Sequence, residues 1–191
     1  MSHFFAYISK MKWIRRWGLM KNTADENIME HSWQVSVIAH ALATIKNEIF
    51  GGNVNAERIA MLALYHETGE VITGDFATPI KYFNPEVKNA IGEMETLAKQ
   101  RIHRMLPEEL QAAYEPLIFP DESSEEYRIV KCADRICAYF KCVEEIKWGN
   151  KEFEKAEVTI RKDIEMIDRE EVKYFMDHFA ESFSLTLDEL N

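Results

Sequence analysis

Apolar residues recur at the spacing of an α-helix along most of this chain, and this pattern restricts the fold more than any other feature. The clearest stripe consists of five side chains at intervals of four, three, four and three residues: His31, Val35, Ile38, Leu42 and Ile45. Residues at these intervals lie on one face of a helix. No stretch alternates polar and apolar residues, with flanking turn signals, as a half-buried strand would. The sequence therefore predicts an all-α protein.

Capping and turn residues divide this pattern into separate helices. Asn27 followed by Glu30 has the form of a capping box, and Ser123 followed by Glu126 predicts a second one. The glycine-rich segment 51–55 separates the first two helices. The expected helices cover about 27–46, 56–72, 85–105, 107–115, 124–148 and 151–180.

The length of the chain favours one domain. It has 191 residues, of which 47% are hydrophobic, so it can bury one sizeable core, and no linker, repeat or low-complexity segment divides it. We therefore expect a single domain over residues 1–191. No run approaches the roughly 18 apolar residues of a membrane span, and residues 1–21 lack the apolar stretch of a signal peptide. The sequence predicts a cytoplasmic protein with no membrane partner.

Charge and cysteine content narrow the class of partner. The net charge of −10 argues against a nucleic-acid polymer, because such binding draws on a basic surface. Residues 1–24 contain Lys and Arg but no Asp or Glu, so this segment either attracts a small anion such as phosphate or forms a solvated helix face. Cys132, Cys137 and Cys142 are spaced by five and diverge by about 140° around a helix. This spacing favours reduced, buried thiols over a disulfide or a zinc site.

Ionisable side chains interrupt the apolar faces of three predicted helices. His31 lies on the first, His66 with Glu67 on the second, and Asp134 on a later one. A charge removed from water must be paired, neutralised or bound to a metal. Imidazole and carboxylate groups together suit divalent ions such as Mn, Fe, Co, Ni or Zn, and ligands on separate helices can converge in a bundle core. The pattern therefore indicates a metal site.

Each of these residues taken alone has a simpler explanation. A single histidine on an apolar face is more often a hydrogen-bonded core residue than a ligand. Glu67 and Glu70 fit the solvated edge of a helix, and Asp134 fits an ion pair with Arg135 or Lys131. The hypothesis of a metal site therefore depends on the co-occurrence of these residues.

The order His, His-acidic, Asp on successive helices resembles the HD-domain superfamily of metal-dependent phosphohydrolases, whose pattern is H…HD…D. Four segments, spread over residues 2–150, resemble the bacterial 5′-deoxynucleotidase family within it: SHFFAYISKMKWIRRWGLMKN, ENIMEHSWQVSVIAHALA, NVNAERIAMLALYHETGEVITGDFATPIKYFN and IVKCADRICAYFKCVEEIKWGN. The most specific part is RW at 16–17 combined with EH, H-x-x-x-E, TGD and TPIKYFN. The resemblance implies a single-domain, all-α HD-domain helical bundle.

The same resemblance implies an activity. The expected enzyme is a homodimeric hydrolase that removes the 5′-phosphate from deoxyribonucleoside 5′-monophosphates with one divalent metal ion, which is Co, Mn, Zn, Ni or Fe. His31, His66, Glu67 and Asp134 would hold this ion, which can polarise the phosphorus centre and make water more acidic. Glu70 would be the general acid or base.

The resemblance also implies a substrate-binding set. Arg16 would bind the phosphate, for which its planar guanidinium is well shaped. Trp17 would pack against the sugar and disfavour a 2′-hydroxyl group. Asp75 and Thr78 would help to place the nucleotide.

One residue departs from the family pattern, because the HD dipeptide reads His66-Glu67 in this chain. The extra methylene adds roughly 1.5 Å, whereas metal–ligand distances tolerate about 0.2 Å. Glu67 must change its rotamer or denticity, shift its helix, or leave its place to water. A second function is therefore a nucleotide-binding or regulatory protein that has lost turnover, although Arg16, Trp17 and Glu70 together favour the enzyme. A third, a helical interaction protein without a ligand, requires the convergence to be accidental.

Overall fold

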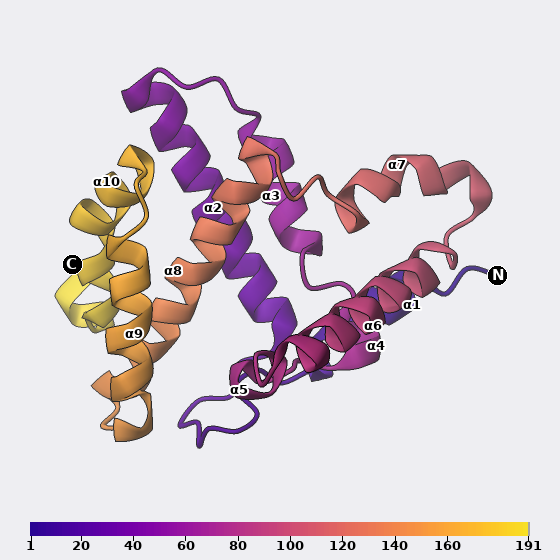
Figure 1. The fold of residues 1–191 in the computed structure, drawn as a ribbon. Helices are drawn as coiled ribbons and strands as arrows, with labels where there is room; N and C mark the ends of the chain where they lie inside the picture. The colour runs from indigo at the N-terminus through magenta and orange to yellow at the C-terminus, as the bar shows by residue number, and fades with distance from the viewer. Residues whose placement is uncertain (191) are drawn as a thin grey trace. The chain divides into compact units, whose positions relative to one another are not determined.

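The computed structural model describes residues 1–190 as helices joined by loops (Figure 1). The α-helices are α1 (Phe4–Ile8), α2 (Ile28–Phe50), α3 (Ala56–Tyr65), α4 (Glu70–Thr73), α5 (Thr78–Lys81), α6 (Pro85–His103), α7 (Glu108–Ile118), α8 (Glu125–Lys147), α9 (Glu154–Glu165) and α10 (Glu170–Phe179). The 3₁₀ turns are η1 (Ser9–Trp13), η2 (Lys151–Phe153), η3 (Ala180–Ser184) and η4 (Leu187–Leu190). Residues 1–190 contain no strand, only an isolated bridge between Arg15 and Asn27. The all-α prediction is confirmed.

The predicted capping box starts α2. The Asn27 side-chain oxygen accepts hydrogen bonds from the backbone N–H groups of Met29 and Glu30, both at 3.0 Å, and the Glu30 carboxylate accepts one from the Asn27 N–H at 3.4 Å. These bonds satisfy N–H groups that a helix start otherwise leaves without partners. The predicted stripe from His31 to Ile45 is buried along its whole length. The cap therefore directs His31 into the interior in the first turn of α2.

The second predicted helix, 56–72, was wrong in its second half. α3 ends at Tyr65, a turn follows over residues 66–69, and α4 begins at Glu70. Both the backbone N–H and the hydroxyl group of Thr68 donate to the Tyr65 carbonyl, which a continuing helix would use for the Gly69 N–H. His66 therefore projects from a turn between two helices, and Glu70 does not follow it on the same helix.

Two further boundaries differ from the prediction. The N-cap of α8 is Ser124, whose hydroxyl accepts from the Tyr127 N–H at 3.1 Å, and not Ser123. The predicted helix over 151–180 is divided into η2, α9 and α10. Arg169, just before α10, donates two hydrogen bonds to Glu125 and one to Glu171, so its side chain is fixed at this break. Acidic residues in the first turn of α10 also favour a new helix start there.

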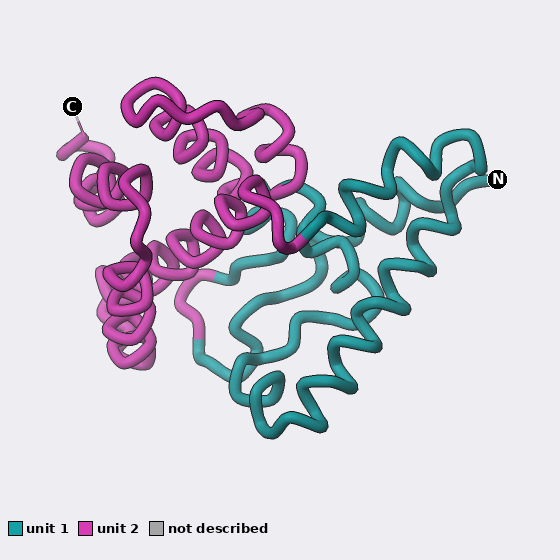
Figure 2. The backbone as a smooth tube through the Cα atoms, turned by 45° about the horizontal axis from the view of Figure 1, so that its top comes forward, with its two compact units in different colours: residues 1–21, 25–33, 64–121 teal, residues 22–24, 34–63, 122–191 magenta. Residues whose placement is uncertain are grey.

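The contacts within the chain define two compact units (Figure 2). The first contains residues 1–21, 25–33 and 64–121, and the second contains residues 22–24, 34–63 and those from 122 onward. Each unit is assembled from stretches that are distant in sequence. The single domain expected over residues 1–191 stays a prediction.

The core of the first unit supports the turn at 66–69. Its buried residues are Phe4, Ile102, Leu106 and Ile118, and α6 packs against α1, α4, α5 and α7. Tyr65, just before the turn, and Val71, just after it, both pack against this core. The turn that carries His66 is therefore fixed by apolar contacts on either side.

Helix α8 forms the centre of the second unit, with α9 packed along it (Figure 1). Cys132, Cys137 and Cys142 on α8 are buried, as predicted, and none of them is part of a disulfide in the described residues. Within residues 1–190, no helix has both the length and the apolar character that crossing a bilayer requires.

A buried ion pair joins α8 to residues 22–24 of the same unit. The side chains of Lys141 and Glu145 are 3% and 0% exposed, and Glu145 accepts hydrogen bonds from Thr23, Ala24, Lys141 and Asn150. Lys141 also donates to the Ala24 carbonyl. Burial alone would raise the pKa of Glu145, but the hydrogen bonds from Lys141, Thr23 and Asn150 outweigh it and lower the pKa to about 2.

We expect Lys141→Met to lower the free energy of unfolding by about 3–5 kcal/mol, because it leaves the Glu145 carboxylate buried without its cation. Urea denaturation at neutral pH measures this loss. Lys147→Met is the matched control, since Lys147 lies on the same helix but is exposed, and it should change the value by no more than about 0.5 kcal/mol. Equal effects of the two substitutions would show that the buried pair is not a main support of this unit.

Candidate metal and nucleotide site

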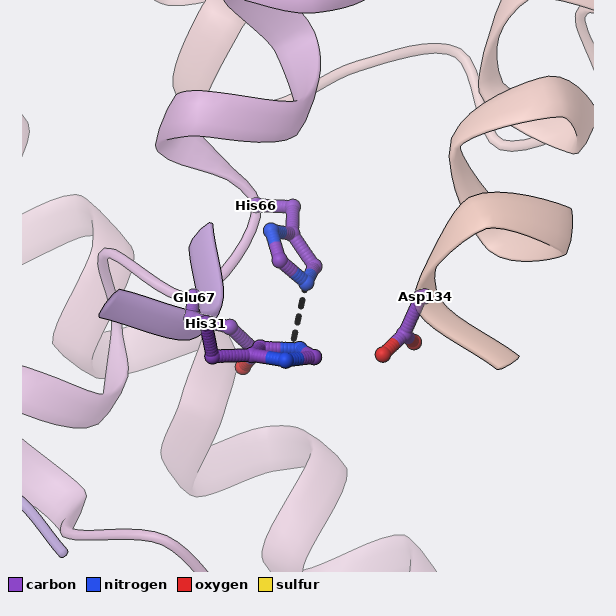
Figure 3. A group of neighbouring side chains, drawn as sticks. All are labelled: His31, His66, Glu67 and Asp134. Carbon is purple, nitrogen blue, oxygen red and sulfur yellow. Dashed lines mark ion pairs between the residues drawn. The ribbon is translucent and has the colours of Figure 1, made fainter. Parts of the chain in front are cut away.

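Three of the predicted metal ligands come together within the first unit. A ring nitrogen of His31, a ring nitrogen of His66 and a carboxylate oxygen of Glu67 lie within 4.8 Å of one another (Figure 3). The two imidazole centroids are 5.4 Å apart, and His66 Nε2 is 3.1 Å from Glu67 Oε1. The side chains of His31 and His66 are 0% and 2% exposed. The Glu67 side chain is 20% exposed, so α2 and the turn at 66–69 place two buried imidazoles beside one partly buried carboxylate.

The longer side chain of Glu67 fits this arrangement. Glu67 lies in the turn at 66–69, so its position is not dictated by the geometry of α3. Its Oε1 reaches hydrogen-bonding distance of His66 Nε2. The replacement of the family's Asp by Glu therefore leaves a carboxylate beside the two histidines. The role of Glu67 as a ligand stays a prediction.

Glu70 adds a second, partly buried carboxyl group next to Glu67. Burial is the main cause that raises the pKa of Glu70 to about 11, followed by the charge and the hydrogen bond of Glu67 and the charge of Asp75, while Arg16 lowers it. These effects favour the protonated form of the Glu70 carboxyl group at neutral pH. A bound cation would reverse part of this effect, because it favours the ionised carboxylate.

The chemistry of this group fits one divalent cation. Imidazole nitrogen and carboxylate oxygen are the donors that borderline divalent metals accept. Glu70 Oε2 is buried and has no hydrogen-bond partner among residues 1–190, which is costly unless another group satisfies it. The neighbouring, partly buried carboxyl groups of Glu67 and Glu70 also repel each other when both are ionised. A cation held here would lower the cost of burying these groups.

Arg16 and Trp17 lie beside His31 in the first unit. Arg16 Nη1 is 2.8 Å from His31 Nδ1 and 2.7 Å from Glu26 Oε2. The Trp17 indole N–H donates to the same Glu26 oxygen at 3.0 Å, and the Arg16 guanidinium carbon lies 5.9 Å from the centre of the Trp17 ring. The structure therefore brings the predicted phosphate-binding residue next to a predicted metal ligand.

Asp75 is tied to the same segment. Burial is the main cause that raises its pKa, the charge of Glu67 adds to this, and the Arg16 charge and a hydrogen bond from the Trp17 backbone N–H oppose it. Asp75 thus contacts the Trp17 backbone. Thr78 is the first residue of α5 and is exposed. The roles of both residues in placing a nucleotide stay predictions.

The sequence analysis missed two charged residues of this group. One is Glu26 in the segment ENIMEH, whose partners Arg16 and Trp17 are nine or ten residues away and are not indicated by any local pattern. The other is Lys81 in TPIKYFN, which pairs with Glu95 at 2.7 Å. Burial alone lowers the pKa of Lys81, but Glu95, together with the charges of Glu67 and Glu70, raises it. Lys81 thus supplies a positive charge to the two site carboxyl groups.

Asp134 belongs to the second unit and projects from α8 (Figure 3). Its side chain is 19% exposed, so it is less buried than the predicted apolar stripe suggested. It forms an ion pair with Lys131, three residues earlier on α8, whereas Arg135 pairs with Asp163. The pairing considered for Asp134 in the sequence analysis therefore occurs with Lys131. Its role as a metal ligand stays a prediction.

Comparison with known proteins identifies the closely related sequences and folds. Residues 3–183 match the family model described as 5′-deoxynucleotidase YfbR-like. A 5′-deoxynucleotidase from Vibrio vulnificus is 50% identical over 193 residues, covering 100% of this chain and 98% of that protein. The 5′-deoxynucleotidase YfbR of Escherichia coli O1:K1 is 51% identical over 193 residues, covering 100% and 96%. An HD-domain phosphohydrolase from Listeria innocua superimposes with a TM-score of 0.83 at 26% identity, covering 95% of this chain and 88% of that one. The predicted HD-domain helical bundle is therefore confirmed.

Proposed function

Because the chain belongs to the YfbR-like 5′-deoxynucleotidase family, we propose that it hydrolyses deoxyribonucleoside 5′-monophosphates to deoxyribonucleosides and inorganic phosphate. The observation that carries this proposal is the group of His31, His66 and Glu67 beside Arg16, in a chain that matches named 5′-deoxynucleotidases over its full length. The test is release of inorganic phosphate from deoxynucleotides with metals supplied one at a time. A protein that binds deoxynucleotides but releases no phosphate with any metal would be the regulatory alternative.

His31, His66, Glu67 and Asp134 are the side chains assigned to one divalent cation, which is Co, Mn, Zn, Ni or Fe. Asp134 enters this assignment through the H…HD…D motif of the sequence and not through a measured distance to the other three. When bound, such an ion polarises the phosphate and makes water more acidic. Imidazole binds a metal ion in its neutral form. The carboxylates would therefore balance the positive charge of the ion.

The remaining residues act on the substrate itself. The Arg16 guanidinium binds the phosphate, since its planar donors match phosphate oxygens. Water forms the new bond to phosphorus as the bond from phosphorus to the 5′-oxygen breaks, and Glu70 gives its carboxyl proton to that oxygen. The proton that the water loses restores the Glu70 carboxyl group. Asp75 and Thr78 help to place the nucleotide. Phosphate binding, proton transfer and placement of the nucleotide are therefore each assigned to a side chain in a direct hydrolysis by water.

Trp17 is assigned to the sugar. We expect Trp17→Ala to raise the ratio of activity on ribonucleotides to activity on deoxyribonucleotides about tenfold, because removal of the indole opens space beside the 2′ position. The ratio of kcat/KM values for paired ribo- and deoxynucleoside monophosphates of the same base measures this effect. Trp13→Ala is the control, because Trp13 is exposed. An unchanged ratio in Trp17→Ala would assign Trp17 to packing alone.

The proposal includes two finer points. We assign the protein to the cytoplasm, because no run of the sequence approaches the roughly 18 apolar residues of a membrane span, and to a homodimer, which the family resemblance implies. Its other partners are restricted to the small-molecule substrate, because the net charge of −10 disfavours a nucleic-acid polymer.

A further inference from the structure

We propose that Glu26 is a positioning residue, which holds Arg16 and Trp17 in the orientations that phosphate and sugar binding require. This inference rests on the proposed function and deepens it. Glu26 would act through these two side chains and would not itself contact the substrate. The residue lies immediately before the N-cap of α2, outside the motif positions that suggest ligands.

The contacts of the Glu26 carboxylate carry the argument. A single oxygen, Oε2, accepts from Arg16 Nη1 at 2.7 Å and from the Trp17 indole at 3.0 Å. The Arg16 and Glu26 side chains are 14% and 12% exposed, so little water competes for these bonds. Charge-assisted hydrogen bonds to a carboxylate are about twice as strong as neutral ones. Loss of this one acceptor would remove a hydrogen bond from both side chains at once.

The backbone around Trp17 gives a second, independent reason. Trp17 has φ of +61°, the left-handed region that a bulky residue rarely adopts. Such a conformation persists only where surrounding contacts impose it. The backbone N–H of Arg16 donates to the Glu26 carbonyl at 2.9 Å, and the indole donates to the Glu26 carboxylate. Glu26 therefore holds this strained segment through both its main chain and its side chain.

Glu26 also lies beside a predicted metal ligand. Its second oxygen, Oε1, is 4.0 Å from His31 Nδ1, and Arg16 bridges the two residues. A separation of 4.0 Å is too long for a hydrogen bond, and Arg16 can only donate, so Glu26 reaches His31 through Arg16 and not by a bond of its own. Removal of an outer partner of a metal ligand typically costs about 10- to 100-fold in activity or metal affinity. The same range is expected for loss of the Glu26 carboxylate.

The first experiment measures the indole N–H signal of Trp17 in the metal-free protein and does not depend on enzyme activity. In a ¹H–¹⁵N spectrum, the Trp17 indole signal is identified by its absence in Trp17→Phe. We expect Glu26→Ala to shift this signal upfield and to speed its exchange with solvent, with Glu26→Gln intermediate. Asp25→Ala is the matched control, because the neighbouring Asp25 pairs with Arg15 on the surface, and it should leave the signal in place. An unmoved indole signal in Glu26→Ala would overturn the proposal.

The second experiment is a double-mutant cycle on kcat/KM with Arg16→Ala. We expect Glu26→Ala to lower kcat/KM about 10- to 100-fold in the parent, and at least threefold less in the Arg16→Ala background, because there it has no guanidinium left to orient. Glu26→Gln should retain part of the activity. Equal losses in the two backgrounds would show that Glu26 acts only on folding or independently of Arg16. A parent protein without phosphatase activity would refute the proposed function, while the indole measurement would still decide the role of Glu26.

Discussion

His31→Ala is expected to bind divalent metal more than about 100-fold more weakly than the parent protein. His31 is completely buried and lies with His66 and Glu67 in one group of donor atoms. Removal of an outer partner of a metal ligand already costs about 10- to 100-fold, so loss of the ligand itself should cost more. Elemental analysis of protein purified without chelator, followed by metal titration of the apo form, measures the change.

The control for this substitution is His40→Ala. His40 is on the same helix, α2, but is exposed. It should retain the full metal content, and both variants should be compared by circular dichroism to establish that they are folded. Equal metal content in His31→Ala and the parent would remove His31 from the site and return it to the class of buried core histidines.

Glu70→Gln is expected to keep its metal and to lose about 10²- to 10⁴-fold in kcat, the usual contribution of a positioned proton-transfer group. Glutamine preserves the size of the side chain but cannot give up a carboxyl proton. The burial and neighbouring charges that raise the Glu70 pKa favour the protonated form in the metal-free protein. Metal titration and steady-state phosphate release on the same preparation separate the two effects.

Glu67→Gln is the comparison variant for Glu70→Gln, because it changes the neighbouring carboxyl group that is the predicted metal ligand. If Glu67 is a ligand, this variant should bind metal more weakly, while Glu70→Gln should not. Glu67→Asp need not improve binding, because the turn at 66–69 already places the longer carboxylate 3.1 Å from His66. A Glu67→Gln protein that binds metal and hydrolyses substrate as well as the parent would show that Glu67 is neither a ligand nor an orienting group.

Local patterns in the sequence predicted the parts of the fold that local interactions determine. The start of α2 was predictable because Asn27 and Glu30 form their hydrogen bonds within one turn. The burial of the stripe from His31 followed from its 3.6-residue period. The residues at positions 31, 66 and 67 could be recognised as candidate metal ligands because they lie on or next to predicted apolar faces.

The remaining features depend on competition between contacts that periodicity does not describe. The helical spacing of Ile59 and Ala63 continues through His66 and Glu70. The Thr68 hydroxyl and N–H nevertheless donate to the Tyr65 carbonyl and end α3. The long helix predicted over 151–180 contains no proline or glycine, yet it breaks where Arg169 pairs with Glu125, 44 residues away in sequence. Glu26 was missed because its partners, Arg16 and Trp17, are contacted only in the folded chain.

The central claim is that this chain is a metal-dependent 5′-deoxynucleotidase, and phosphate release measures it most directly. Apo protein is supplied with Co, Mn, Zn, Ni or Fe singly and is given deoxy- and ribonucleoside 5′-monophosphates, with a 3′-monophosphate as the positional control. We predict release of phosphate from the deoxynucleoside 5′-monophosphates with at least one metal, and much less from their ribonucleotide counterparts and from the 3′-ester. Release that needs no metal, or none from any deoxynucleotide with every metal supplied, would contradict the claim.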